Sequence, residues 1–277
     1  MNEKNLNFLR DSAKLLDIDL TEKQLEAFSQ YLTLLVEWNQ KFNLTAITDE
    51  KEIVIKHFVD SFSIVSFLRN TGMPADIKKN SQMNFQTNFQ SDTPVDFLSA
   101  PQSTETLSLL DIGAGAGFPG IPLKILFREQ LKVTLMDSVA KKVTFMDEVI
   151  RSLYLADCIA LHARAEDLAR QNEHREQYRF VTARALASLP VLVEYGLPFL
   201  KIGGYLIAMK AGREGAEEEV QQSQKVLAVM GGKISSIKTF SLPQTDLTRT
   251  IILIQKIAVT PAQYPRKAGL PSKKPLI

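Results

Sequence analysis

The sequence is short of the residues that build disulfides, metal centres and nucleophilic sites. Its 277 residues include one cysteine, Cys158, which cannot form an internal disulfide; it lies in an apolar run, so we expect a buried, unreactive thiol in a reducing compartment. The three histidines are not paired with one another at the spacing of metal ligands, and no metal site is predicted. His57 and Asp60 share a helix face, where we expect a solvated or capping role. The G-x-S-x-G motif of nucleophilic hydrolases is also lacking.

Net charge and long apolar runs are scarce as well. The formal net charge is +2, so any binding of nucleic acid must come from a local basic patch. Each long apolar run is interrupted by a charge or a glycine before it reaches the length of a membrane span, and the first residues contain no apolar core of a signal peptide. We therefore expect a cytoplasmic protein without membrane contact, and nothing in the composition demands more than a monomer.

Four segments differ in their residue patterns. Residues 1–71 carry apolar positions at helical spacing and two capping-box patterns, Thr21 with Gln24 and Asp49 with Glu52, which predict a helical region. Residues 72–106 are rich in Asn, Gln, Ser and Thr and lack periodicity, which predicts a mobile, dispensable low-complexity insertion. Residues 107–257 are expected to form the domain that carries the functional site, and residues 258–277 a basic, proline-rich tail.

Residues 107–257 alternate between strand and helix patterns, which is typical of a doubly wound α/β sheet. Helices are expected between the first six strands, including Ala216–Met230, and the last two strands form a hairpin. Five parallel strands followed by an antiparallel pair make the seven-stranded, Rossmann-like sheet of class I methyltransferases. The predicted strands are Leu107–Ile112, Leu131–Met136, Cys158–His162, Phe180–Ala183, Tyr205–Lys210, Lys233–Ser241 and Thr248–Ile254.

The sequence after the first strand is D-x-G-x-G-x-G, with Asp111 followed by Gly113, Gly115 and Gly117. Alternate glycines allow a tight turn and a close approach of the backbone to a ligand. Asp137 lies 24 residues beyond Gly113, at the tip of the second strand, where a carboxylate can bind a ribose diol. This pairing predicts a nucleoside-cofactor site.

Two residues distinguish between the cofactors that such a site can hold. A dinucleotide fingerprint, G-x-G-x-x-G, requires glycine where Phe118 stands. Asp111 would repel a pyrophosphate but would favour the cationic sulfonium and amine of S-adenosylmethionine. We therefore expect Asp111 to contact the methionine part of this cofactor. S-adenosylmethionine is therefore the predicted cofactor, and an NAD-dependent oxidoreductase stays open as the alternative.

The third and fourth strand tips complete the predicted site. Ala165 and Glu166 follow the third strand, where backbone N–H groups and a carboxylate can bind the edge of the adenine. Arg184 ends the fourth strand, where the substrate or the cofactor carboxylate must lie. The Asn/Asp-Pro-Pro-aromatic sequence of enzymes that methylate exocyclic amines is missing at this tip, which favours a target that is already nucleophilic, such as guanine N7. Arg184 would then position the reactants, and no general base is expected.

Two segments have a composition that suits RNA. The segment 38–45 mixes aromatic, amide and basic side chains, which can bind RNA bases or can simply end a helix. The tail holds four basic residues and no acid, and its four prolines predict an extended chain without helix. Contact with phosphates and a solvated tail remain equally open from composition.

Taken together, several segments resemble the RsmG (GidB) family of bacterial small-subunit rRNA methyltransferases, which modify guanine N7 in 16S rRNA. The resemblance spans nearly the whole chain except 73–106, which leaves only the surface near the amino-terminal part in doubt. The segments are Asn43–Thr45, His57–Ser61, Asp111–Pro122, Met136–Ser138, Lys141–Lys142, Arg164–Glu166, Ala183–Ala185 and Tyr264–Gly269.

The resemblance implies an S-adenosylmethionine-dependent enzyme that acts on small-subunit rRNA or the assembled small subunit. It implies cofactor contacts from Gly113, Phe118, Ala165, Glu166 and Arg184. It also implies that the tail and the Asn43–Thr45 region face the RNA. A small-molecule methyltransferase and a non-catalytic RNA-binding protein remain as alternatives. The predicted RNA-binding residues are Asn43, Lys141, Lys142, Arg266, Lys267, Lys273 and Lys274.

Overall fold

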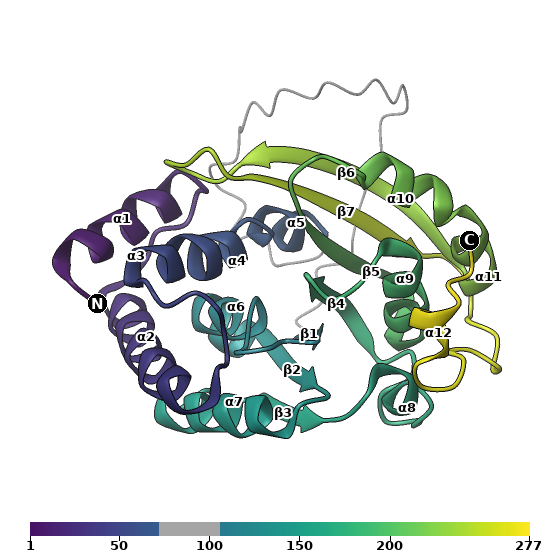
Figure 1. The fold of residues 1–277 in the computed structure, drawn as a ribbon, viewed down its shortest axis with the longest axis horizontal. Coiled ribbons are helices and arrows are strands. Elements are labelled where there is room, and N and C mark those ends of the chain that lie inside the picture. Colours follow the sequence, from purple (N-terminus) through teal and green to yellow (C-terminus); the bar gives the residue numbers. More distant parts are fainter. Residues whose placement is uncertain (72–105) are drawn as a thin grey trace.

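The computed structural model describes residues 1–71 and 106–277, and most of the predicted insertion lies outside these residues. The amino-terminal part is helical, as predicted (Figure 1). It includes a short π-helical segment, η1. Its elements are α1 (Glu3–Lys14), α2 (Glu22–Phe42), α3 (Glu50–Ile53), η1 (Val54–Val59), α4 (Asp60–Phe62) and α5 (Val65–Asn70).

Local side-chain caps explain where these helices begin. Thr21 and Gln24 form the predicted capping box at α2, and Asp49 Oδ1 accepts a hydrogen bond from the backbone N–H of Glu52 at 2.9 Å. Each cap satisfies a donor that the first helical turn leaves without a partner. Helix α2 ends at Asn43, which adopts the left-handed conformation with φ of 48°.

A seven-stranded sheet in the order β3-β2-β1-β4-β5-β7-β6 forms the centre of the molecule (Figure 1). Neighbouring strands among the first five are parallel, and β7 pairs antiparallel with both β5 and β6, which confirms the predicted class I methyltransferase sheet. The strands are β1 (Leu107–Ile112), β2 (Leu131–Asp137), β3 (Cys158–His162), β4 (Tyr178–Arg184), β5 (Leu200–Ala211), β6 (Gly232–Ser241) and β7 (Thr248–Lys256).

Both faces of the sheet are covered, and each face has its own core. Leu109 of β1 points into a core shared with the amino-terminal helices, α6 and α7, whereas Leu110 points into a second core with α9 and α11. This alternation follows from the period of two residues in a strand. The remaining helices are α6 (Gly120–Phe127), η3 (Arg128–Gln130), α7 (Ala140–Ser152), α8 (Ala165–Leu168), α9 (Leu189–Gly196), η4 (Leu197–Phe199), α10 (Ala216–Gln222), α11 (Gln224–Met230) and α12 (Leu270–Lys273).

Two predicted elements differ in the structure. The helix expected over Ala216–Met230 is divided at Ser223, whose hydroxyl donates to the carbonyl of Glu219 at 2.7 Å. The tail is not free of helix, because α12 forms at its end. Pro271 lies in the first turn of α12, where a missing N–H costs nothing, so the prolines did not prevent this helix.

Three structural observations concern the classes considered from composition. Across the residues that the structure describes, no helix combines the length and apolar character of a membrane span. Cys158 is buried, as predicted, and burial raises the pKa of its thiol to about 12. In the same residues there is no cluster of three or more His, Cys, Asp or Glu side chains that could hold a metal ion.

Candidate active site

The glycine loop, residues 113–119, lies at the carboxyl end of β1, between β2 and β4. This is where the strand order reverses, and ligands of open α/β sheets bind at such a point. Gly113, Gly115 and Gly117 all have positive φ, at 67°, 63° and 95°. The structure therefore uses all three predicted glycines for conformations that L residues rarely adopt.

The space around the three glycines shows which side of the loop is open. A Cβ at Gly113 would lie 2.7 Å from Leu186 Cδ1, and one at Gly117 would lie 2.8 Å from the Tyr31 hydroxyl. A Cβ at Gly115 would meet only a backbone oxygen at 4.0 Å. The loop is thus packed at both ends, and its middle leaves room for a ligand to approach the backbone.

Asp111 lies beneath the loop and is 0% exposed. Its carboxylate accepts hydrogen bonds from the Gly120 N–H at 2.9 Å and the Thr182 hydroxyl at 3.0 Å. Burial raises the pKa of Asp111 to about 7, although both hydrogen bonds oppose the shift. The expectation of direct cofactor contact needs correcting: Asp111 fixes the start of α6 and can act on a bound cation only through its charge.

Asp137 ends β2 beside the loop. Its Oδ2 accepts from the Gly115 N–H at 3.0 Å and its Oδ1 from the Val139 N–H at 2.9 Å. Each carboxylate oxygen has a further lone pair, so hydroxyl groups of a ribose can still donate to it. Lys142, predicted to contact RNA, places its Nζ 3.6 Å from Asp137 Oδ2, whereas Lys141 is exposed.

Glu166, in the first turn of α8, is linked to the tail. It is buried, and its Oε1 accepts from the backbone N–H of Gly269 in the tail at 2.7 Å. One oxygen of this carboxylate thus holds the tail, and its contact with adenine stays a prediction. Ala165 begins α8 close by, since Ala163 donates its N–H to the Asp137 carbonyl at 3.2 Å.

Phe118 is buried in an aromatic stack and does not line an open surface. Its ring stacks on the His57 ring, with the ring centroids 4.4 Å apart, and on the Tyr31 ring, with the centroids 5.2 Å apart. The Tyr31 hydroxyl donates to the carbonyl of Ala116. The Phe118 ring thus packs against α2 and η1, which together brace the glycine loop, and contact of Phe118 with the cofactor stays a prediction.

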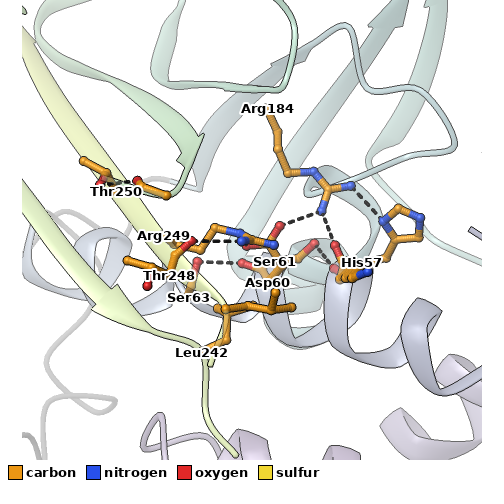
Figure 2. A network of polar contacts seen from close by, with 12 residues as sticks. His57, Asp60, Ser61, Ser63, Arg184, Leu242, Thr248, Arg249 and Thr250 are labelled. Carbon is orange, nitrogen blue, oxygen red and sulfur yellow. Dashed lines mark hydrogen bonds and ion pairs between the residues drawn. The ribbon is translucent and has the colours of Figure 1, made fainter. Parts of the chain in front are cut away.

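Arg184 reaches from the end of β4 to the amino-terminal helices (Figure 2). Its Nη1 donates to the Lys56 carbonyl at 2.9 Å and to Asp60 Oδ2 at 3.0 Å, and its Nη2 donates to His57 Nδ1 at 3.2 Å. The second oxygen of Asp60 accepts from Arg249 Nε at 2.8 Å. Within residues 1–71 and 106–277, the structure gives no partner to the Nε–H of Arg184 or to the other proton of Nη2.

The contacts of His57 define its tautomer. Arg184 can only donate, so Nδ1 must carry a lone pair, and the proton on Nε2 then points to Thr45 Oγ1 at 3.1 Å. Burial and the charge of Arg184 lower the pKa of His57 to about 3, which keeps the ring neutral. The expectation of a solvated or capping role for His57 and Asp60 is therefore wrong; the only sequence signal of their role was their place in a family segment.

The predicted RNA-binding residues are not gathered in one place. Asn43 is exposed at the end of α2, beside a cavity of about 500 Å³ between α2 and the loop that follows it. In the tail, Lys267, Lys273 and Lys274 are exposed. Arg266 instead forms a two-pronged ion pair with Glu194, which is 1% exposed, so its charge is already taken up within the protein.

The loop after β4 contains contacts that the sequence did not indicate. Ala185 has φ of 51°, and Leu186 packs against Gly113. Lys210 donates to the Ala187 carbonyl at 2.8 Å and pairs with Glu219 at 2.7 Å, and Glu219 accepts from the backbone N–H of Leu189 at 2.8 Å. This ion pair fixes the loop from β5 and α10.

Comparisons with known proteins found relatives of this chain. A family model described as rRNA small subunit methyltransferase G matches residues 24–77 and 91–248. The chain is 43% identical over 279 residues to ribosomal RNA small subunit methyltransferase G of Acetivibrio thermocellus, with 100% of both chains covered. It is 45% identical to the protein of that name from Desulfitobacterium hafniense, covering 95% of this chain and 93% of the other. Among solved structures, a fibrillarin of Aeropyrum pernix with natively bound S-adenosyl-L-methionine matches at a TM-score of 0.44 and 15% identity, over 54% of this chain and 66% of that one.

Proposed function

The chain belongs to the rRNA small subunit methyltransferase G family, and from that premise we propose that it methylates N7 of a guanine in 16S rRNA. S-adenosylmethionine is the methyl donor. The observation that carries the proposal is one edge of the sheet, where the open middle of the glycine loop, Asp137 and Arg184 come together.

The residues at this edge fit the parts of the cofactor. The backbone around Gly115 is open to the methionine part, and Asp137 keeps lone pairs for the ribose hydroxyls. The backbone of Ala165 and Glu166 lies next to Asp137 along the strand edge, on the side proposed for adenine. The N–H groups of Arg184 that have no partner among the described residues suit the cofactor carboxylate. When bound, the cofactor supplies a methyl group on a positively charged sulfur.

The titratable groups near this edge favour an acceptor that needs no proton removed. Asp111 is enclosed beneath the loop, and both nitrogens of His57 are engaged by Arg184 and Thr45. Glu166 is engaged by Gly269. Guanine N7 has a free lone pair and attacks without a general base, so the protein's contribution is alignment, charge and exclusion of water.

We further propose that RNA approaches along the exposed lysines of the tail and the end of α2. Lys267, Lys273 and Lys274 can contact phosphates, and Lys141 and Asn43 can extend the contact near the glycine loop. With small-subunit rRNA as its substrate, the protein is proposed to act in the cytoplasm, and as a monomer.

The test is incubation with labelled S-adenosylmethionine and small ribosomal subunits from a strain that lacks this enzyme, followed by nucleoside mass spectrometry. New 7-methylguanosine is the expected product, and Arg184→Gln should yield none while it remains folded. Cofactor binding without that nucleoside would overturn the RNA assignment and favour a small-molecule acceptor. Thermal stabilisation by NAD but not by S-adenosylhomocysteine would overturn the methyltransferase assignment.

A further inference from the structure

We propose that Asp60 and His57 are positioning residues that orient Arg184 for the carboxylate of the cofactor's methionine. The inference rests on the proposed function of Arg184 and adds the residues through which it acts. It starts from the polar network in Figure 2, in which a long side chain from the sheet is fixed by groups of the amino-terminal helices.

An arginine on its own is a poor positioning device, because its side chain has several freely rotating bonds. Three hydrogen bonds fix the guanidinium of Arg184. Its Nη1 donates to the Lys56 carbonyl and to Asp60, and its Nη2 donates to His57. Three acceptors around a planar group define the orientation of its plane. The conformational entropy of this side chain is thus lost during folding, so ordering it adds no cost when the cofactor binds.

The acceptors leave one part of the guanidinium available. Its Nε–H and one proton of Nη2 have no partner among the described residues, and the side chain is 15% exposed. These two protons can lie on the same side of a guanidinium and can donate to both oxygens of one carboxylate. The network therefore leaves a donor pair that suits the cofactor's carboxylate.

Asp60 is itself fixed, which makes it an anchor for Arg184. It is buried, and its second oxygen accepts from Arg249 Nε on β7 at 2.8 Å. Arg249 also donates to the carbonyl of its neighbour Thr248 at 3.0 Å. One carboxylate thus joins side chains from β4 and β7 to α4, and its loss would free Arg184 on the side opposite to the donor pair.

His57 contributes an acceptor whose direction is set by packing. Its ring lies parallel to Phe118 at 4.4 Å, and Thr45 receives its Nε2 proton. The stack fixes the ring plane and Thr45 fixes the tautomer, so that Nδ1 presents its lone pair to Arg184.

A comparison of two cofactors tests the proposal: S-adenosylmethionine and its decarboxylated form, which lacks only the carboxylate. Isothermal titration measures the Kd of each for the wild type and for Asp60→Asn, His57→Phe and Arg184→Gln. Asp60→Asn keeps the size of the side chain, and His57→Phe keeps a ring against Phe118. Glu52→Gln is the matched control, since it removes an exposed ion pair with Lys56 on the preceding turn.

We expect Asp60→Asn and His57→Phe to weaken S-adenosylmethionine at least tenfold and its decarboxylated form less than twofold. The KM for S-adenosylmethionine should rise by the same factor, while kcat at saturation falls less than threefold. A purely structural role would weaken both cofactors equally, and that result would overturn the inference.

The variant Arg184→Gln separates failure of this inference from failure of the proposed function. If Arg184→Gln discriminates between the cofactors and the two positioning variants do not, the inference is wrong and the role of Arg184 stands. If Arg184→Gln weakens both cofactors equally, its role at the carboxylate is wrong as well. Should Asp60→Asn fail to fold by circular dichroism, His57→Phe alone decides.

Discussion

The helices on one face of the sheet hold the glycine loop with aromatic rings, whereas the other face holds the tail with buried carboxylates. On the first face Tyr31 and His57 enclose Phe118, within a core that continues into β1. On the second face Glu194 pairs with Arg266, and Glu166 accepts from Gly269. The packing of rings against one another depends little on salt concentration or pH, whereas the strength of an ion pair depends on both. The two faces should therefore respond differently to the same perturbations.

The largest effect is expected from adding a methyl group within the glycine loop. Gly117→Ala would place a Cβ 2.4 Å from Ile121 and 2.8 Å from the Tyr31 hydroxyl, at a φ of 95°. We expect the free energy of unfolding to fall by roughly 2–5 kcal/mol, from strain and overpacking together. Urea denaturation measures it.

Gly115→Ala is the matched control for that change. It adds the same methyl group at positive φ but into open space, so the cost should be about 1–2 kcal/mol. Cofactor affinity should nevertheless drop, because the methyl group occupies the open side of the loop. Equal destabilisation by the two variants would show that packing against α2 does not fix the loop.

On the other face, Glu194→Ala leaves the guanidinium of Arg266 without its partner. Removing one member of a buried pair costs about 3–5 kcal/mol, and partial exposure of Arg266 reduces this to roughly 1–3 kcal/mol. Cofactor affinity should stay within twofold. Unchanged stability in urea would mean that the tail is held by Arg175, which donates to the Thr260 and Tyr264 carbonyls.

A smaller effect, of about tenfold in affinity for small subunits, is expected from replacing Lys267, Lys273 and Lys274 together by alanine. Each lysine that contacts a phosphate steepens the salt dependence of binding by about one unit of slope. The triple variant should therefore flatten this dependence by two to three units. Lys132→Ala, near the amino end of β2 and so at the other end of the strands from the site, should leave the salt dependence unchanged.

The smallest effect is the response of cofactor affinity to pH. Burial raises the pKa of Asp111 to about 7 in the folded protein, so the folded state holds a proton between about pH 4 and 7 that the unfolded state has lost. Stability from this group therefore falls as the pH rises through that range.

Cofactor binding should have the opposite dependence on pH. A cationic cofactor favours the ionised carboxylate, so its affinity should rise several-fold as the pH rises through 7. Titration calorimetry at pH 6 and pH 8 measures this, and Asp111→Asn should remove the difference. A difference that persists in the variant would assign it to another group.

Features that depend on a few consecutive residues were predictable, and features that join distant segments were not. The capping box at Thr21, the glycine loop and the succession of strands and helices follow from local patterns and the periodicity of strands. Asp60 meets Arg184 and Arg249 from positions more than one hundred residues away, and no local pattern encodes that contact.

The tail illustrates a second reason for wrong predictions. Composition described its charges but not their partners, and Arg266 turned out to be paired inside the protein. Glu166 was likewise placed at a strand tip, but its hydrogen bond from Gly269 was not foreseen, because the two residues meet only in the folded chain.

The π-helical segment η1 has a consequence for how this site is encoded. An α-helix turns by about 100° per residue, and a π-helical segment holds one residue more per stretch than an α-helix would. This segment, Val54–Val59, ends directly before Asp60, so its extra residue sets the direction in which Asp60 projects. Deleting one apolar residue here would rotate Asp60 by about a quarter turn away from both arginines, with every polar group of the site retained. The alignment of the site is thus stored in the length of the chain as well as in the identity of its side chains.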